Sequence, residues 1–77
     1  MTTDMVKDLI KQGLSGATVE VTDERNTGDH FNAIVEWDGF EGLSLIEQHR
    51  KVYDSLGEYM TQGIHALGLK TVVPEKV

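Results

Sequence analysis

The chain has 77 residues, with 13 acidic and 7 basic side chains and a formal net charge of −6. A chain of this length forms one domain with a thin core, and its acidic balance argues against tight, nonspecific binding to nucleic acid. It has no cysteine, which excludes a disulfide or a thiolate ligand of its own. Its first residues lack the basic start and apolar stretch of a signal peptide, and no apolar run approaches the ~20 residues that span a bilayer, so we expect a cytoplasmic protein without a membrane partner.

The first predicted element is a short amphipathic helix over residues 3–13. Its apolar residues recur at helical spacing, namely Met5, Val6, Leu9, Ile10 and Leu14. Thr3 is placed to cap the start of this helix, while Gly13 and Gly16 mark its end.

Two strands follow, both predicted from an alternation of apolar and polar residues. Residues 17–22 and 31–37 each show the period of two that is typical of a half-buried strand. The segment 24–29 between them is polar and rich in turn-forming residues. The two strands are therefore expected to pair as a hairpin with a fairly long loop.

A turn is predicted at residues 39–42, where Gly-Phe-Glu-Gly fits the GXXG pattern of KH domains. In KH domains this loop clamps a nucleic-acid backbone. A carboxylate from Glu41 is unfavourable beside phosphate, and the bulky Phe40 indicates an anchor in the core. We interpret the segment as a turn that precedes a helix.

The longest predicted helix covers residues 45–61. Ser44 and Glu47 match a capping box at its start, and Gly63 is expected to end it in the left-handed conformation. Its apolar stripe is predicted to contain His49 in a structural role, together with Leu45, Ile46, Val52, Tyr53, Leu56, Tyr59 and Met60. Residues 64–72 predict a third strand, with His65, Leu67 and Leu69 on one face.

This order of elements predicts an α+β fold with three strands and the helices packed on one face. We expect a single domain over residues 1–77, with a core over residues 5–73 and a short flexible tail over residues 74–77. There is no cysteine nucleophile, no phosphate-cradling loop and no pair of carboxylates with a supporting histidine, so we expect no enzyme.

His30 and His65 open two of the predicted strands, and together they would form half of a metal site. A partner would have to supply the other half. From the residues alone, a hydrogen-bonded histidine at a strand end is the simpler hypothesis for His65. For His30, a ring that packs beside Phe31 is an equal alternative. A loose zinc site that includes Asp29, or a purely structural interaction domain, is a third hypothesis.

Four segments in this order and spacing resemble the BolA family, over roughly residues 5–73. They are Asp29-His30-Phe31, Phe40-Glu41-Gly42, Gln48-His49-Arg50-Lys51-Val52-Tyr53 and Ile64-His65-Ala66-Leu67. The resemblance implies an αββαβ, class II KH-like fold with a three-stranded mixed sheet.

The resemblance also implies two functions. In the first, the chain pairs with a monothiol glutaredoxin and shares a [2Fe-2S] cluster with it, in iron homeostasis or cluster delivery. The glutaredoxin brings its own cysteine and a bound glutathione, and alone the chain holds no cofactor. The family's histidine ligand matches His65, and a second ligand from the loop before the second strand falls to His30. Two ligand sets stay open: His65 alone, and His65 with His30.

The second implied function is that of a DNA-binding transcriptional regulator in stress response and cell morphology. Its predicted contacts are Arg50, Lys51 and Lys70, and binding through phosphate would weaken steeply with salt.

Overall fold

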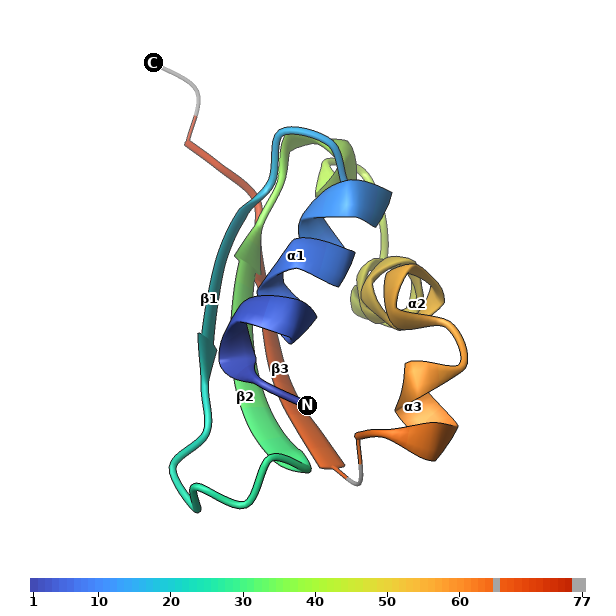
Figure 1. The fold of residues 1–77 in the computed structure, drawn as a ribbon. Helices are drawn as coiled ribbons and strands as arrows, with labels where there is room; N and C mark the ends of the chain where they lie inside the picture. The colour runs from blue at the N-terminus through green and yellow to red at the C-terminus, as the bar shows by residue number, and fades with distance from the viewer. Residues whose placement is uncertain (65, 76–77) are drawn as a thin grey trace.

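The computed structural model describes residues 1–64 and 66–75 of the chain. Along the chain the elements are α1 (Thr3–Gly13), β1 (Thr18–Thr22), β2 (His30–Glu36), the 3₁₀ helix η1 (Asp38–Phe40), α2 (Leu45–Leu56), α3 (Tyr59–Gln62) and β3 (Ala66–Val72). Figure 1 shows α1 and α2 on one side of the sheet and an open face on the other. The predicted α+β fold is confirmed.

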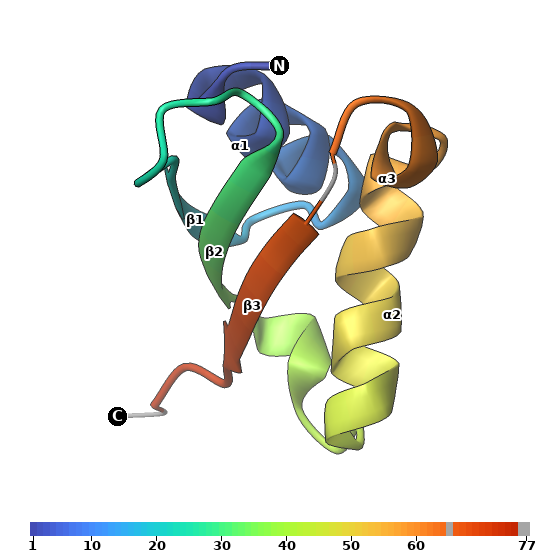
Figure 2. The same ribbon diagram turned by 90° about the horizontal axis from the view of Figure 1, so that it is seen from below.

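The sheet has the strand order β1-β2-β3 and is mixed. β1 pairs with β2 in antiparallel fashion, with Val19 opposite Val35, and this confirms the predicted hairpin. β2 and β3 are parallel, with Phe31 opposite Leu67. A parallel pair requires a long crossover, which η1, α2 and α3 provide. Figure 2 shows α2 crossing the helix side of the sheet, with α3 leading the chain back toward β3.

The core lies between the helices and the inner face of the sheet. The alternating residues Phe31, Ala33 and Val35 of β2 are all buried, as the period of two predicts. They meet apolar residues at helical spacing, Val6 and Ile10 from α1 and Val52 and Leu56 from α2. Within the described residues, no helix is long and apolar enough to cross a membrane.

The caps of the helices follow the predictions with one correction. Helix α1 covers the predicted residues, but its N-cap is Thr2 and not Thr3: the Thr2 hydroxyl accepts a hydrogen bond from the Met5 amide at 3.2 Å. At the start of α2, the Ser44 hydroxyl accepts from the Glu47 amide at 3.2 Å, as the capping box predicts.

The predicted helix over residues 45–61 is divided in two, so the expectation of one long helix ended by Gly63 was wrong. Helix α2 ends at Leu56, and Gly57 follows with φ of 55°. A left-handed glycine terminates a helix and turns the chain. The short helix α3 then leads to Ile64, which is buried in the core. β3 begins at Ala66, the register partner of His30 in β2.

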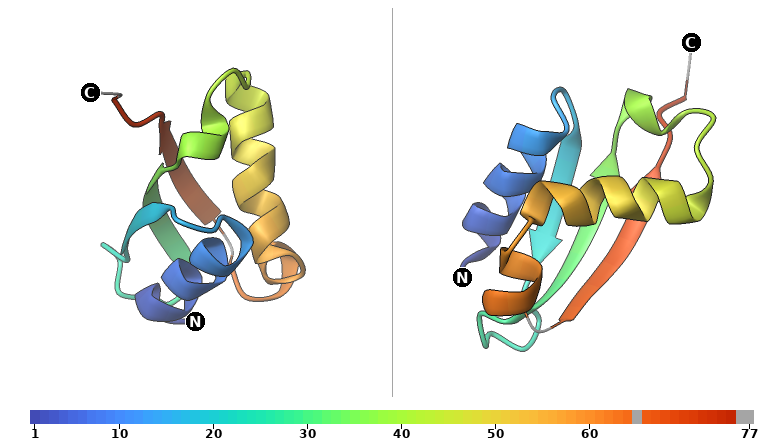
Figure 3. Two further views of the ribbon diagram at one scale, coloured as in Figure 1. Left: turned by 90° about the horizontal axis from the view of Figure 1, so that it is seen from above. Right: turned by 90° about the vertical axis from the view of Figure 1, so that its right-hand side faces the viewer.

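The apolar stripe predicted for α2 is only partly buried. Val52 and Leu56 face the core, but Leu45 and Ile46 are 62% and 68% exposed. Figure 3 (right) shows the reason, because the first turn of α2 projects beyond β3 and has no sheet beneath it. His49 is half-buried rather than a core residue, and its ring stacks edge-on to Tyr53 with centroids 6.3 Å apart.

The segment that resembles GXXG is a turn anchored in the core, as predicted. Phe40 at the end of η1 is fully buried and packs edge-on against the Trp37 ring, with centroids 5.3 Å apart. The Trp37 indole in turn donates to the Ser15 carbonyl at 2.9 Å, which links this turn to the end of α1. Glu41, the next residue, is exposed.

Candidate functional site

β2 and β3, the two strands that the sequence predicts to open with histidine, start at the same end of the sheet. β2 begins at His30, and its register partner Ala66 begins the parallel strand β3. The Ala66 amide also donates to the Asp29 carbonyl at 3.1 Å. His65 lies outside the described residues. The residue that follows it is therefore placed directly beside His30, at the end of the sheet.

His30 is oriented by a carboxylate from the preceding residue. Its Nδ1 lies 2.7 Å from Asp29 Oδ1, and its side chain is 26% exposed. A carboxylate accepts only, so in a neutral ring Nδ1 carries the proton and Nε2 carries the lone pair. This is the tautomer that a carboxylate imposes on a histidine that ligates metal through Nε2.

The loop between β1 and β2 is organised by Asp23. Its Oδ1 accepts from the Thr27 amide at 3.3 Å, and its Oδ2 accepts from the Gly28 amide at 2.8 Å. The Thr27 hydroxyl donates to Asp29 Oδ1 at 2.6 Å, which is the same oxygen that faces the His30 ring. Gly28 has φ of 75°, a conformation that favours glycine.

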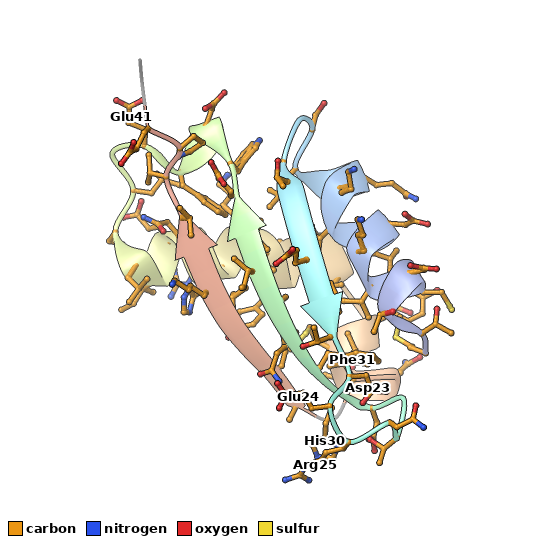
Figure 4. The ribbon with its side chains drawn as sticks, turned by 90° about the vertical axis from the view of Figure 1, so that its left-hand side faces the viewer. Asp23, Glu24, Arg25, His30, Phe31 and Glu41 are labelled. Atoms are coloured by element: carbon orange, nitrogen blue, oxygen red, sulfur yellow. The ribbon has the colours of Figure 1, made fainter. Side chains whose placement is uncertain are left out.

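His30 projects onto the open face of the sheet, because Phe31 beside it is buried on the helix side. Figure 4 looks onto this open face and places His30 together with Glu24 and Arg25 where β2 begins. A hollow of about 240 Å³ is lined by these three residues and by Phe31, Asn32, Ala66 and Gly68.

A second hollow, of about 330 Å³, opens on the helix side. It is lined by Asp29, by Ile64 and by residues of α3 and its exit, namely Met60, Thr61, Gln62 and Gly63. Ile64 borders this hollow, whereas Ala66 borders the one that contains His30.

The described residues bring few possible metal ligands together in one place. Within residues 1–64 and 66–75, no group of three histidine, aspartate or glutamate side chains is placed to hold a metal ion. A [2Fe-2S] cluster requires four protein or thiol ligands, and this chain contains no cysteine. What the described site offers is an imidazole with its orientation set by Asp29.

Comparison with known proteins identifies the family. The profile for BolA-like proteins matches residues 10–76. The chain belongs to the BolA family. A solved BolA homologue from Coxiella burnetii is 41% identical and superposes with a TM-score of 0.84, covering 96% of this chain and 92% of that one.

Two curated relatives extend the comparison across BolA proteins. BolA-like protein 2 from Mus musculus is 32% identical over 78 residues, covering 99% of this chain and 90% of its own. The DNA-binding transcriptional regulator BolA from Escherichia coli is 30% identical over 78 residues, covering 87% of this chain and 74% of its own.

Some relatives are much longer than this chain. The match spans 19% of SufE-like protein 1 and 36% of the chloroplastic protein BOLA1, both from Arabidopsis thaliana. In these proteins the BolA region is one part of a longer polypeptide.

The cations proposed for DNA binding do not gather on one face of this BolA fold. Arg50 and Lys51 are exposed on α2, which packs on the helix side of the sheet. Lys70 is exposed on β3 between the inward-facing Leu69 and Thr71, so it projects from the open face. The structure therefore separates Lys70 from the other two.

Sequence reasoning identified His30 but missed the residues that hold it. Asp29 was named in the Asp29-His30-Phe31 segment and as a loose zinc ligand, but not as a partner of His30, and neither Asp23 nor Thr27 was singled out. The available signal was an aspartate directly after β1, with threonine and glycine four and five residues later in a polar loop. An aspartate side chain in such a loop can accept hydrogen bonds from backbone amides of the turn.

Proposed function

We propose that this BolA-family protein is a non-enzymatic adaptor that pairs with a monothiol glutaredoxin and shares a [2Fe-2S] cluster with it. His65 would be the primary ligand and His30 the second. The role would be in iron homeostasis or in delivery of the cluster. The observation that carries the proposal is the pairing of His30 with Asp29 beside the start of β3.

The pairing supports a ligand role because it sets the orientation and the tautomer of the His30 ring in the metal-free protein. A carboxylate on Nδ1 fixes the ring and leaves Nε2 as the basic nitrogen. A histidine that merely packed beside Phe31 would not require this partner. Ala66 is the register partner of His30. His65, the predicted primary ligand, immediately precedes Ala66 in the sequence.

The composition of the chain requires the remaining ligands to come from elsewhere. In the proposed complex, the glutaredoxin cysteine and its bound glutathione would supply two thiolates, and this chain would supply imidazoles. Imidazole in place of thiolate raises the reduction potential of a [2Fe-2S] cluster. The chain's own task is to present neutral, oriented rings and to dock the partner that carries the thiols.

The test is to titrate the protein into a cluster-loaded monothiol glutaredoxin while following the visible circular dichroism spectrum. We expect a new spectrum that saturates at one equivalent. His65→Ala should abolish this spectrum, and His30→Ala should alter it if both rings are ligands.

The matched control is His49→Ala, which removes a half-buried histidine on α2 that stacks on Tyr53. This variant should give the wild-type spectrum. If the wild-type protein produces no spectral change, or if His65→Ala and His49→Ala behave alike, the adaptor proposal fails.

DNA binding is the second candidate function, favoured by relatives that are named DNA-binding transcriptional regulators. In this chain the contacts would come from Arg50 and Lys51 on the exposed side of α2. We expect affinity for duplex DNA to fall steeply with salt if phosphates are bound. Absence of binding to a duplex at low salt would exclude this candidate.

A further inference from the structure

We propose that Thr27 and Asp23 are positioning residues that hold the His30 imidazole in the orientation its ligand role requires. The ligand role itself belongs to the function proposed above. The orientation of the ring is a property of this chain alone and can be measured without any partner or metal.

The first link is the Thr27 hydroxyl. It donates to Asp29 Oδ1 at 2.6 Å, and the same oxygen accepts from His30 Nδ1 at 2.7 Å. A carboxylate oxygen has two lone pairs and can accept both bonds. The hydroxyl therefore stops the carboxylate from rotating and keeps this oxygen directed at the ring.

The second link is Asp23, which holds Thr27 in place. Its two carboxylate oxygens accept from two successive amides, those of Thr27 and Gly28. Asparagine at this position would offer one acceptor, and its amide group would face a backbone N–H as a second donor. Replacing Asp23 by Asn should thus release one side of the loop while leaving the size of the side chain unchanged.

These contacts form one path from β1 to β2 across the loop. Asp23 fixes the Thr27 backbone, the Thr27 hydroxyl fixes the Asp29 carboxylate, and Asp29 fixes the His30 ring. Outer partners of ligating histidines commonly change metal affinity by about 10–100-fold when they are removed. Among the described contacts, Thr27 reaches His30 through Asp29, and Asp23 reaches it through the backbone of Thr27 and Gly28.

The test measures which ring nitrogen of His30 carries the proton, by long-range proton–nitrogen NMR of the labelled full chain at about pH 8, where free imidazole is neutral. His30→Gln and His49→Gln assign the signals. We expect Nδ1–H for His30 in the wild type. Thr27→Val and Asp23→Asn should shift the ring toward the Nε2–H form.

Two matched controls separate positioning from a general disturbance of the loop. Thr27→Ser keeps the hydroxyl and should restore the wild-type tautomer. Glu24→Gln removes a neighbouring charge outside this hydrogen-bond path and should leave the tautomer unchanged. If the amide NMR spectrum shows that Asp23→Asn no longer folds the loop, the positioning role is decided by comparing the His30 tautomer in Thr27→Val with that in Thr27→Ser. The proposal is overturned if His30 carries Nε2–H in the wild type, or if Thr27→Val matches Thr27→Ser.

A second measurement relates the ring to the proposed function. With a cluster-loaded glutaredoxin, Thr27→Val should bind about tenfold more weakly than Thr27→Ser. If the wild type binds no glutaredoxin, the adaptor function fails while the tautomer experiment still decides the positioning role. If the tautomer shifts but affinity does not, His30 is oriented without being a ligand, and the positioning role for ligation is refuted.

Discussion

Replacing Phe40 with alanine tests whether the GXXG-like turn is an anchor of the core or a nucleic-acid clamp. Phe40 is fully buried and packs against the Trp37 ring, which is itself hydrogen-bonded to the end of α1. Removing the phenyl ring leaves a cavity at the junction of β2, η1 and α2. The turn would also lose the contact that fixes its position before the Ser44 cap.

The expected cost is about 3–5 kcal/mol, the range for truncating a buried phenylalanine to alanine. About 0.5–1.5 kcal/mol of this corresponds to the lost edge-on aromatic pair. A small domain has about 0.05–0.15 kcal/mol of stability per residue, so this chain has roughly 4–12 kcal/mol in total. The variant should consequently lie near the limit of folding at room temperature.

The assay is equilibrium unfolding in urea, with the wild type and Ile46→Ala as references. Ile46 is a large apolar residue close to the same turn but 68% exposed, so its truncation should change stability by no more than about 0.5 kcal/mol. A loss below about 1 kcal/mol for Phe40→Ala would refute the anchor, since such a value lies outside the range for buried rings. The segment would then have to be reconsidered as a binding loop.

Three further predictions follow from the backbone and the surface charge. Gly57→Ala should destabilise by about 1–2 kcal/mol in urea unfolding, because φ of 55° is costly for any residue with a Cβ; an unchanged midpoint would contradict the helix break. Gly13→Ala should cost about 1–3 kcal/mol because its Cβ would collide with Ser55 on α2, and a double-mutant cycle with Ser55→Gly should recover part of the loss; strict additivity would argue against the contact. If the protein binds duplex DNA, reversing Arg50 and Lys51 to glutamate should reduce the slope of log K against log salt by roughly 2, and an unchanged slope would exclude these two residues as phosphate contacts.

The fold was largely predictable because its inner faces follow simple periods. The alternation of Phe31, Ala33 and Val35 and the spacing of Val6 and Ile10 indicated which sides are buried, and burial confirms them. The Ser44 cap marked the start of α2 correctly. These signals are local, and each agrees with the tertiary packing.

Two wrong predictions concern where a helix ends and which of its apolar residues are buried, and both depend on tertiary structure. The apolar pattern continues in phase through Gly57, and one glycine inside a helix costs only about 1 kcal/mol, so periodicity alone favoured an unbroken helix. The need to bring β3 beside β2 determines the break. Periodicity also cannot show where the sheet ends, and for that reason Leu45 and Ile46 were assigned to the core although they overhang β3.

The candidate site was predictable in part. The family resemblance pointed to His30 and His65, and His30 indeed lies at the mouth of β2 beside the start of β3, while His65 lies outside the described residues. The path from Asp23 through Thr27 and Asp29 was not predictable. It depends on the conformation of an irregular loop, in which residues four and five apart meet without any repeating pattern.

The most direct test of cluster sharing is to detect the nitrogen ligand itself. The protein is labelled with ¹⁵N in histidine only, combined with an unlabelled cluster-loaded monothiol glutaredoxin, reduced by one electron and examined by pulsed electron paramagnetic resonance. We predict a strong coupling of the cluster to ¹⁵N that is lost in His65→Ala and retained in His49→Ala. A cluster that forms in the mixture but shows no histidine coupling from this chain would contradict the account.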